Sequence, residues 1–375
     1  MSIFERKAAK ILNKAGIEIN GSNPWDVQIK DKSIFRDVIL KGSLGLGDGY
    51  VKGKWDVESV DQFFERLLLI DADHTFNFLD FAQSMRNKLI NTQAGRRAFM
   101  VGQKHYDLGN GMYEQMLGES MGYSSGLYLD ESNDLATAQY NKFEDLCKKL
   151  ELKPGMKVLE IGAGWGTFAR HAAKNYGVEV VGLTISKEQK KFADKRCEGL
   201  PVEILLVDYR NLDEKYNSYF DRVVSIEMVE AVGKKNIDLY FDTVEKAMKE
   251  DGLFGMQAIL GSGHDDTFLS TQIFPNGHVP SIDTIEKSIN RSLRIDRWDS
   301  FGRDYEKTLL AWEENFRNNW DNILELKNNA NEYEYDDNFF RMWRYYLLCC
   351  AGSFRVGFND VVQVVISKQN AMISI

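Results

Sequence analysis

The feature that most constrains the fold is a regular alternation of apolar strands and amphipathic helices that starts near residue 140. The predicted elements are a helix at 141–152, a strand at 156–161, a helix at 167–176, a strand at 178–183, a helix at 187–196, and strands at 204–207 and 223–226. Strands that alternate with helices of these lengths indicate a parallel sheet with helices on both faces. The predicted fold class is therefore α/β and doubly wound.

Length and charge limit the classes of protein that this chain can belong to. Its 375 residues exceed one ordinary core, so we expect two domains. A net charge of −9 argues against nucleic acid as a partner, because phosphate backbones attract basic surfaces.

The first residues, Met1–Lys7, form a charged amphipathic pattern and no later segment has the apolar length of a membrane span, which predicts a cytoplasmic protein. The four cysteines lack zinc-site spacing, so we expect no metal.

The N-terminal region predicts a small separate domain followed by a basic linker. Residues 1–80 combine a glycine-rich turn at 42–50 with a helix at 60–70. The segment 81–106 contains no acidic residue, and its cations are Arg86, Lys88, Arg96, Arg97 and Lys104. Such a segment suits the surface of an anionic bilayer. A linker with a merely solvated basic face is the alternative.

A glycine-rich turn follows the first predicted strand of the sheet. The strand 157–161 leads into Gly162, Gly164 and Gly166, and glycines in such a turn let the backbone approach a bound ligand. The spacing and the acidic Glu160 are more typical of methyltransferases than of dinucleotide enzymes. A strand, turn and helix of this kind without any cofactor is the alternative.

Polar residues also follow the later strands, where a doubly wound sheet gathers its ligand. They are Thr184, Gln189, Asp208, Tyr209 and the segment 227–230. The acidic residue that usually binds a ribose after the second strand is missing, since Thr184 stands there. We therefore expect the sugar contact to be neutral or to come from elsewhere.

Six short motifs are spread along the chain, namely His105–Asn110, Tyr123–Gly126, Glu160–Gly166, Val181–Gln189, Phe301–Tyr305 and Cys350–Arg355. Together these motifs resemble the cyclopropane-fatty-acyl-phospholipid synthases over about the whole chain. The resemblance implies a Rossmann-like class I methyltransferase domain with a small N-terminal α+β domain. It also implies three regions, namely a lipid- or dimer-associated domain at 1–80, a basic linker at 81–104, and a catalytic domain with an acyl-binding cap at 105–375.

The resemblance implies an activity as well. Such an enzyme transfers a methylene group from S-adenosylmethionine to a cis double bond in a membrane phospholipid, through a carbocation that a bound bicarbonate ion deprotonates. It implies a homodimer that contacts the inner face of the cell membrane peripherally.

Site residues follow from the same resemblance. The implied catalytic residues are Glu230, Tyr305, Gln257, Ser125 and Ile259. The implied cofactor-binding residues are Tyr123, Ser124, Glu160, Gly162, Gly164, Gly166, Thr184, Gln189, Asp208 and Tyr209. This chain departs from the family pattern at two positions, where Ser125 replaces the usual Cys and Gln257 the usual His. Glutamine can still donate one hydrogen bond to an anion, so we expect an active enzyme with an altered anion site.

Alternatives stay open for the site residues, for the aromatic segment and for the activity. Taken alone, Glu230 could be a solvated carboxylate and Tyr305 part of an aromatic core. The aromatic segment 339–348 is either a lining for the acyl chain or ordinary core. The protein could also yield a methyl-branched or hydroxylated lipid, or be a lipid-binding paralogue without turnover.

Overall fold

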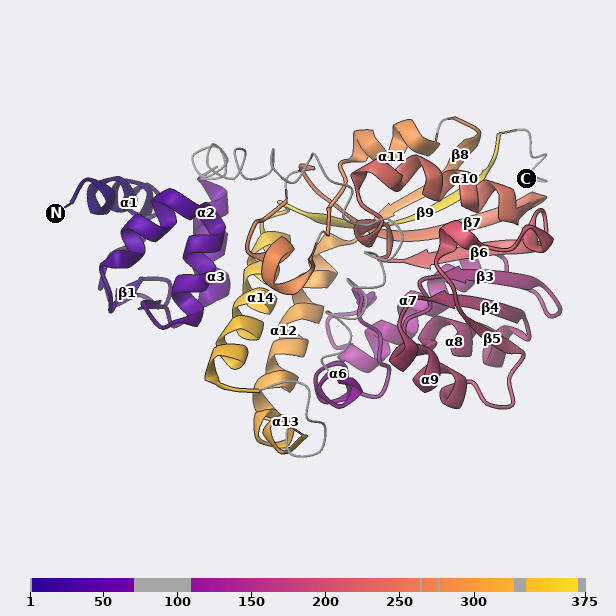
Figure 1. Cartoon of the computed structure of the whole chain (residues 1–375), viewed down its shortest axis with the longest axis horizontal. Helices are drawn as coiled ribbons and strands as arrows, with labels where there is room; N and C mark the ends of the chain where they lie inside the picture. The colour runs from indigo at the N-terminus through magenta and orange to yellow at the C-terminus, as the bar shows by residue number, and fades with distance from the viewer. Residues whose placement is uncertain are drawn as a thin grey trace. The chain divides into compact units, whose positions relative to one another are not determined.

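The chain divides into two compact units (Figure 1). The computed structural model describes residues 2–70, 109–263, 265–275, 277–289, 291–326 and 335–369. Unit 1 comprises Met1–Thr92, Asp265–Asn276 and Tyr305–Asn359, and unit 2 comprises Gln93–His264, Gly277–Asp304 and Asp360–Ile375. The basic linker at 81–104 and the start of the first motif, 105–108, lie outside the described residues. Among the described residues, no helix combines the length and the apolar character that crossing a membrane requires.

Unit 2 is built on a seven-stranded mixed sheet in the order β5-β4-β3-β6-β7-β9-β8. The strands are β3 (Lys157–Ile161), β4 (Glu179–Thr184), β5 (Val202–Leu206), β6 (Phe220–Ile226), β7 (Met248–Leu260), β8 (Leu293–Ser300) and β9 (Asp360–Lys368). The four predicted strands, β3 to β6, are parallel as predicted, and β7 adds a fifth parallel strand that was not predicted, whereas β9 runs antiparallel to both β7 and β8. The predicted α/β class is confirmed, with an antiparallel addition at one edge.

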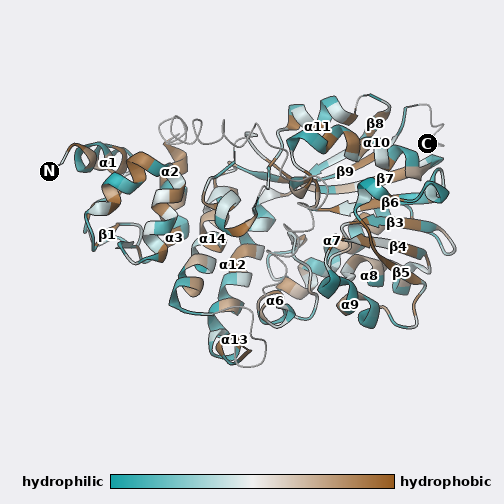
Figure 2. Cartoon of the chain, in the orientation of Figure 1, coloured by the Kyte–Doolittle hydropathy of each residue, from teal (hydrophilic) through white to brown (hydrophobic). Residues whose placement is uncertain are grey.

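Helices cover both faces of this sheet (Figure 1). They are α7 (Leu135–Lys149), α8 (Thr167–Tyr176), α9 (Lys187–Arg196), α10 (Ile237–Ala247) and α11 (Ile282–Ile289), and the short helix α6 (Asn110–Leu117) belongs to the same unit. Because strand side chains alternate, Val158 packs with α7 and α8, while its neighbour Leu159 packs with α10 and α11. Helix α9 is largely hydrophilic (Figure 2), and it buries only Gln189 and Ala193.

The bounds of α8 and α9 agree with the predicted helices at 167–176 and 187–196. Helix α7 starts six residues earlier than the predicted 141, at Leu135. The carboxylate of Asp134 explains this start, because it accepts a hydrogen bond from Thr137 N at 2.8 Å and so caps the helix.

Unit 1 is mainly helical. Its helices are α1 (Ile3–Lys14), α2 (Ser33–Val51), α3 (Val60–Leu69), most of α12 (Gly302–Asn318), α13 (Trp320–Leu326) and α14 (Asp337–Arg355). The two short strands β1 (Gln28–Ile29) and β2 (Trp55–Asp56) pair antiparallel. Helix α14 packs against α2 and α3, so segments nearly 300 residues apart in sequence share one core.

The predicted glycine-rich turn at 42–50 is wrong, because this segment belongs to the helix α2. Only Gly42 departs from helical geometry, with φ 57° and ψ −136°. The other glycines permit close packing instead of a turn. A Cβ atom on Gly47 would lie 2.2 Å from the ring of Phe268, which leaves room for hydrogen only.

The aromatic segment of α14 forms stacked contacts inside unit 1. Phe339 stacks on Trp343 with centroids 5.4 Å apart, and Phe339 also lies parallel to Trp320 at 6.3 Å. Tyr345 contacts the rings of Tyr50 and Phe268. These side chains therefore contribute to the core of unit 1, and the acyl-binding cap stays a prediction.

Candidate functional site

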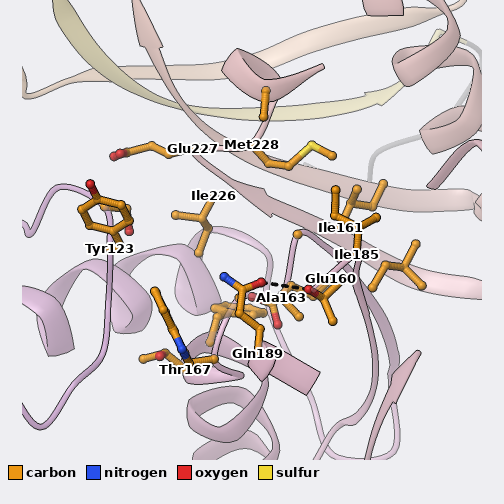
Figure 3. Close-up of a pocket in the computed structure, with 18 of the residues that line it drawn as sticks. Tyr123, Glu160, Ile161, Ala163, Thr167, Ile185, Gln189, Ile226, Glu227 and Met228 are labelled. Atoms are coloured by element: carbon orange, nitrogen blue, oxygen red, sulfur yellow. Dashed lines mark hydrogen bonds between the residues drawn. The ribbon is translucent and has the colours of Figure 1, made fainter. Parts of the chain in front are cut away.

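A pocket lies at the carboxyl ends of the parallel strands β3, β4, β5 and β6 (Figure 3). It is lined by these predicted cofactor-binding residues: Tyr123, Ser124, Glu160, Gly162, Gly164, Thr184, Gln189, Asp208 and Tyr209. Parallel strands end at a common edge, and this is the place where doubly wound sheets bind ligands. The structure therefore brings nine of these residues to one cavity, and the tenth, Gly166, lies outside its lining.

The three glycines of the turn have different roles. All three have positive φ, at 87° for Gly162, 51° for Gly164 and 74° for Gly166. A Cβ atom on Gly164 would meet nothing within 4 Å, so its position is open to the pocket, whereas one on Gly166 would lie 2.9 Å from Ala193 in α9. Gly164 thus leaves space for a ligand, and Gly166 allows α9 to pack closely.

Glu160 presents a buried, unsatisfied oxygen to the pocket. Glu160 is 3% exposed, and its Oε2 atom has no hydrogen-bond partner among the residues that the structure describes. Burial raises the pKa of this carboxyl well above its ordinary value, and a backbone hydrogen bond from Ala169 opposes the shift. A buried polar atom without a partner is costly, so this oxygen fits a hydrogen-bond donor supplied by a ligand.

The residues after β4 and β5 form local hydrogen bonds at the pocket wall. Thr184 Oγ1 donates to Gln189 Oε1 at 2.8 Å, which fixes the amide of Gln189. Asp208 accepts hydrogen bonds from Arg210, including one from Arg210 Nε at 2.8 Å. The hydroxyl of Tyr209 is buried and makes no hydrogen bond within the described part of the chain. Gln189 and Tyr209 therefore keep polar groups available next to the cavity.

A buried lysine lies behind the Tyr123–Ser124 segment. Lys142 is 0% exposed, and its Nζ donates to Ser124 Oγ at 2.6 Å and to Gln139 Oε1 at 2.5 Å. Burial lowers the pKa of Lys142 to about 7, although the charge of Glu227 acts in the opposite direction. This lysine therefore positions the loop that forms one side of the pocket.

Four of the predicted catalytic residues, Ser125, Glu230, Gln257 and Ile259, lie in unit 2. Two glutamates, Glu227 and Glu230, accept the hydrogen bonds of the other three. Ser125 N donates to Glu227 Oε1 at 2.9 Å, and Gln257 Nε2 donates to the same oxygen at 2.8 Å. Gln257 is fully buried, and its own Oε1 accepts from Gln363 Nε2 at 3.0 Å. The side chain of Glu227 therefore occupies the space between the two positions where this chain departs from the family pattern.

The second glutamate of the pair is Glu230. Its Oε1 accepts a hydrogen bond from Ile259 N, while its Oε2 is buried without a partner. Burial, together with the charge of Glu227, raises the pKa of Glu230 to about 8. The raised pKa favours the protonated form of Glu230 at neutral pH.

This raised pKa predicts a measurable pH dependence of stability. Between its ordinary pKa of 4.5 and its folded value of about 8, Glu230 binds a proton in the folded protein only, so stability falls as the pH rises. One such proton corresponds to about 1.4 kcal/mol per pH unit. In urea titrations at pH 5, 6 and 7, the unfolding free energy of the parent protein should therefore decrease by about 1.4 kcal/mol per pH unit relative to that of Glu230→Gln. Parallel curves for the two proteins would contradict the assignment.

The fifth predicted catalytic residue, Tyr305, belongs to unit 1. It is 6% exposed, and its ring packs on Phe354 with centroids 4.6 Å apart and on Trp312 at 5.9 Å. Its catalytic role stays a prediction.

Two residues at the site were not among the predicted site residues. Glu227 was visible only as one of the polar residues after β6. Lys142 falls among Ala138, Phe143 and Leu146 on the buried face of α7, and a lysine on an apolar helical face is the signal that could have identified it.

The sheet order, the glycine turn and the pocket at the strand ends define a class I S-adenosylmethionine-dependent methyltransferase. A family model described as mycolic acid cyclopropane synthetase matches residues 93–364. The chain belongs to this cyclopropane synthase family, and the resemblance predicted from the motifs is confirmed.

Curated and solved relatives agree with this assignment. The cyclopropane-fatty-acyl-phospholipid synthase of Escherichia coli strain K12 is 43% identical over 97% of this chain and 93% of its own length. A tuberculostearic acid methyltransferase of Mycobacterium tuberculosis is 32% identical over 90% of this chain and 82% of its own. The solved mycolic acid cyclopropane synthase CmaA1 with SAH and CTAB is 28% identical, with a TM-score of 0.65, and covers 72% of this chain and 98% of its own.

Proposed function

We propose that this enzyme transfers a methylene group from S-adenosylmethionine to the cis double bond of unsaturated phospholipid acyl chains and so forms a cyclopropane ring. The observation that carries the proposal is the 43% identity to the Escherichia coli phospholipid enzyme across 97% of the chain. That similarity extends beyond residues 93–364, the part that the family model matches, and includes the N-terminal region.

The pocket residues have the chemistry to hold S-adenosylmethionine. The unpartnered Oε2 of Glu160 would accept a hydrogen bond from a donor group of the nucleoside or the amino acid, and the fixed amide of Gln189 would contact a polar group of the ligand. The open space at Gly164 lets the ligand approach the backbone. An isolated alkene is a weak nucleophile, so these contacts act mainly by holding the sulfonium methyl in line with it.

The bicarbonate ion implied by the resemblance does not fit the described donors. Ser125 N and Gln257 Nε2 already donate to Glu227, and Ile259 N already donates to Glu230. An anion placed among them would also meet the charge of Glu227, and repulsion at 4 Å amounts to about 4 kcal/mol near a protein surface. We therefore do not assign the deprotonation step to bicarbonate.

The experiment that tests the proposed function is mass spectrometry of lipids. The purified enzyme is incubated with S-adenosylmethionine and vesicles that contain a monounsaturated phospholipid, and the acyl chains are then analysed. A gain of one CH₂ group per double bond, with loss of the alkene signal, is the expected result. Unchanged lipids would refute the proposal.

A methyl-branched product is the second candidate, because a relative at 32% identity is named a tuberculostearic acid methyltransferase. The same carbocation, quenched by hydride, would yield a saturated chain that has gained CH₄ in place of CH₂. The mass of the product separates these two outcomes in the same experiment.

We further propose that the enzyme works in the cytoplasm as a homodimer that contacts the inner face of the membrane through the basic segment 81–104. Replacing Arg86, Lys88, Arg96 and Arg97 by Gln should weaken binding to anionic vesicles and leave affinity for S-adenosylmethionine unchanged. The attraction is electrostatic and is screened over about 8 Å at physiological salt. Vesicle sedimentation at low and high salt measures it, and binding that is insensitive to both salt and substitution would exclude this segment.

A further inference from the structure

Glu227 occupies the position that the family resemblance reserves for a small anion. Its Oε1 accepts hydrogen bonds from Ser125 N at 2.9 Å and from Gln257 Nε2 at 2.8 Å, the two positions where the sequence departs from the family pattern. Glu227 also lines the pocket that contains the glycine turn. A carboxylate and a bicarbonate ion offer the same planar pair of oxygens to such donors.

We propose that the carboxylate of Glu227 is the catalytic base that removes a proton from the transferred methyl group, in place of bicarbonate. The inference rests on the proposed function. In the first step the sulfonium methyl forms a bond to one alkene carbon, the sulfur keeps the electron pair as a thioether, and the neighbouring alkene carbon becomes a cation. A C–H bond of the new methyl group then breaks. Its proton passes to Glu227, and its electron pair closes the ring at the cationic carbon.

The neighbouring glutamate keeps the charge on Glu227. Two carboxyl groups that interact this strongly cannot both be ionised easily, and environment decides which one holds the proton. Glu230 is the protonated member, since its Oε2 is buried without a partner and its pKa is raised to about 8. Glu227 has two hydrogen-bond donors directed at one oxygen, which favours its charged form. A charged acceptor next to a developing cation is the arrangement that deprotonation requires.

The backbone also holds Glu227 in an unusual conformation. Its φ of 48° is in the left-handed region, and Glu227 N donates to Gln257 O at 2.7 Å just beyond the end of β6. A non-glycine residue in this region is strained, and such strain persists where the surrounding structure fixes it. In Figure 3 the carboxylate of Glu227 lies on the Tyr123 side of the pocket, and the side chain of Met228 extends in the opposite direction.

The test combines removal of the base with chemical rescue. In buffer stripped of CO₂, the parent enzyme should form the CH₂ adduct at the same rate with and without added bicarbonate. Glu227→Gln should lower turnover about 100-fold or more, the usual contribution of a general base, while affinity for S-adenosylmethionine measured by calorimetry stays within about twofold. Any adduct of CH₃ and OH that replaces the CH₂ adduct in this variant supports the same conclusion, since water then captures the undeprotonated cation.

The variant Glu227→Gly tests whether an added carboxylate can replace the side chain of Glu227. Glycine tolerates the left-handed backbone and leaves a cavity bordered by the donors of Ser125 and Gln257. Added bicarbonate or formate should restore turnover in proportion to its concentration. Glu245→Gln, which alters a carboxylate that accepts a hydrogen bond from Ser292 at 2.7 Å on α10, is the matched control and should keep the parent rate.

Three results would overturn the inference. They are a parent enzyme that needs bicarbonate, a folded Glu227→Gln protein with the parent rate, and a Glu227→Gly protein that no small carboxylate rescues. If the parent enzyme makes no lipid adduct under any condition, the proposed function fails instead, so the two failures are distinguishable.

Discussion

Replacing Gly164 by valine should abolish binding of S-adenosylmethionine in a protein that still folds. The Cβ position of Gly164 meets no atom within 4 Å and borders the pocket, so the branched side chain would fill the space that the ligand needs. We expect the dissociation constant measured by calorimetry to rise at least about 100-fold, which corresponds to about 3 kcal/mol.

A matched variant separates this effect from backbone strain. Gly155 also has positive φ, at 82°, and a Cβ atom there likewise meets nothing within 4 Å, but Gly155 does not line the pocket. Gly155→Val should therefore carry a similar strain and keep the affinity of the parent protein. Unchanged affinity in a folded Gly164→Val protein would mean that the ligand binds elsewhere.

Replacing Arg355 by methionine should destabilise the protein by about 2 kcal/mol, because the loss of this partly buried cation leaves its partly buried carboxylate partners unpaired. The guanidinium contacts Asp61 at 2.6 Å, Glu65 at 3.0 Å and Glu306 at 2.7 Å, so it joins α14 to α3 and α12 within unit 1. Arg355 is the last residue of the motif 350–355, so this motif contributes to the packing of helices in unit 1. Denaturant unfolding measures the change.

Arg317→Met is the control for this prediction. Arg317 also lies in unit 1, but its side chain is 48% exposed and its ion pair with Glu313 spans 3.7 Å. Exposed pairs of this kind contribute less than about 1 kcal/mol. Equal destabilisation by the two substitutions would show that the three carboxylates around Arg355 do not depend on its charge.

Local sequence patterns were sufficient for the elements around the pocket. Helices α8 and α9 have the predicted bounds, because Gly166 and Gly177 flank α8 and the side chain of Ser186 caps the start of α9. The same reasoning failed for 42–50, where glycines usually mean a turn. Their purpose in α2 is close contact with residues such as Phe268, more than 200 positions away, and no local pattern contains that information.

At the candidate site, too, the sequence predicted some features and missed others. The sequence placed Glu160, Gly164 and Gln189 after successive strands, and a parallel sheet necessarily brings such positions to one edge. It assigned Ser125 and Gln257 to the binding of an external anion. It contained no local sign that Glu227 would take both of their hydrogen bonds.

By itself the sequence determined the α/β class, the family and the strand ends that form the pocket, because these depend on periodicity, turns and motifs along a short stretch of chain. Only the tertiary structure decided that Asp265–Asn276 and Tyr305–Asn359 join the N-terminal helices in one unit, and that Glu227 lies between Ser125 and Gln257. These arrangements depend on packing and hydrogen bonds between segments about 30 to nearly 300 residues apart. Their energies are set by the final distances between atoms, which no single stretch of sequence specifies.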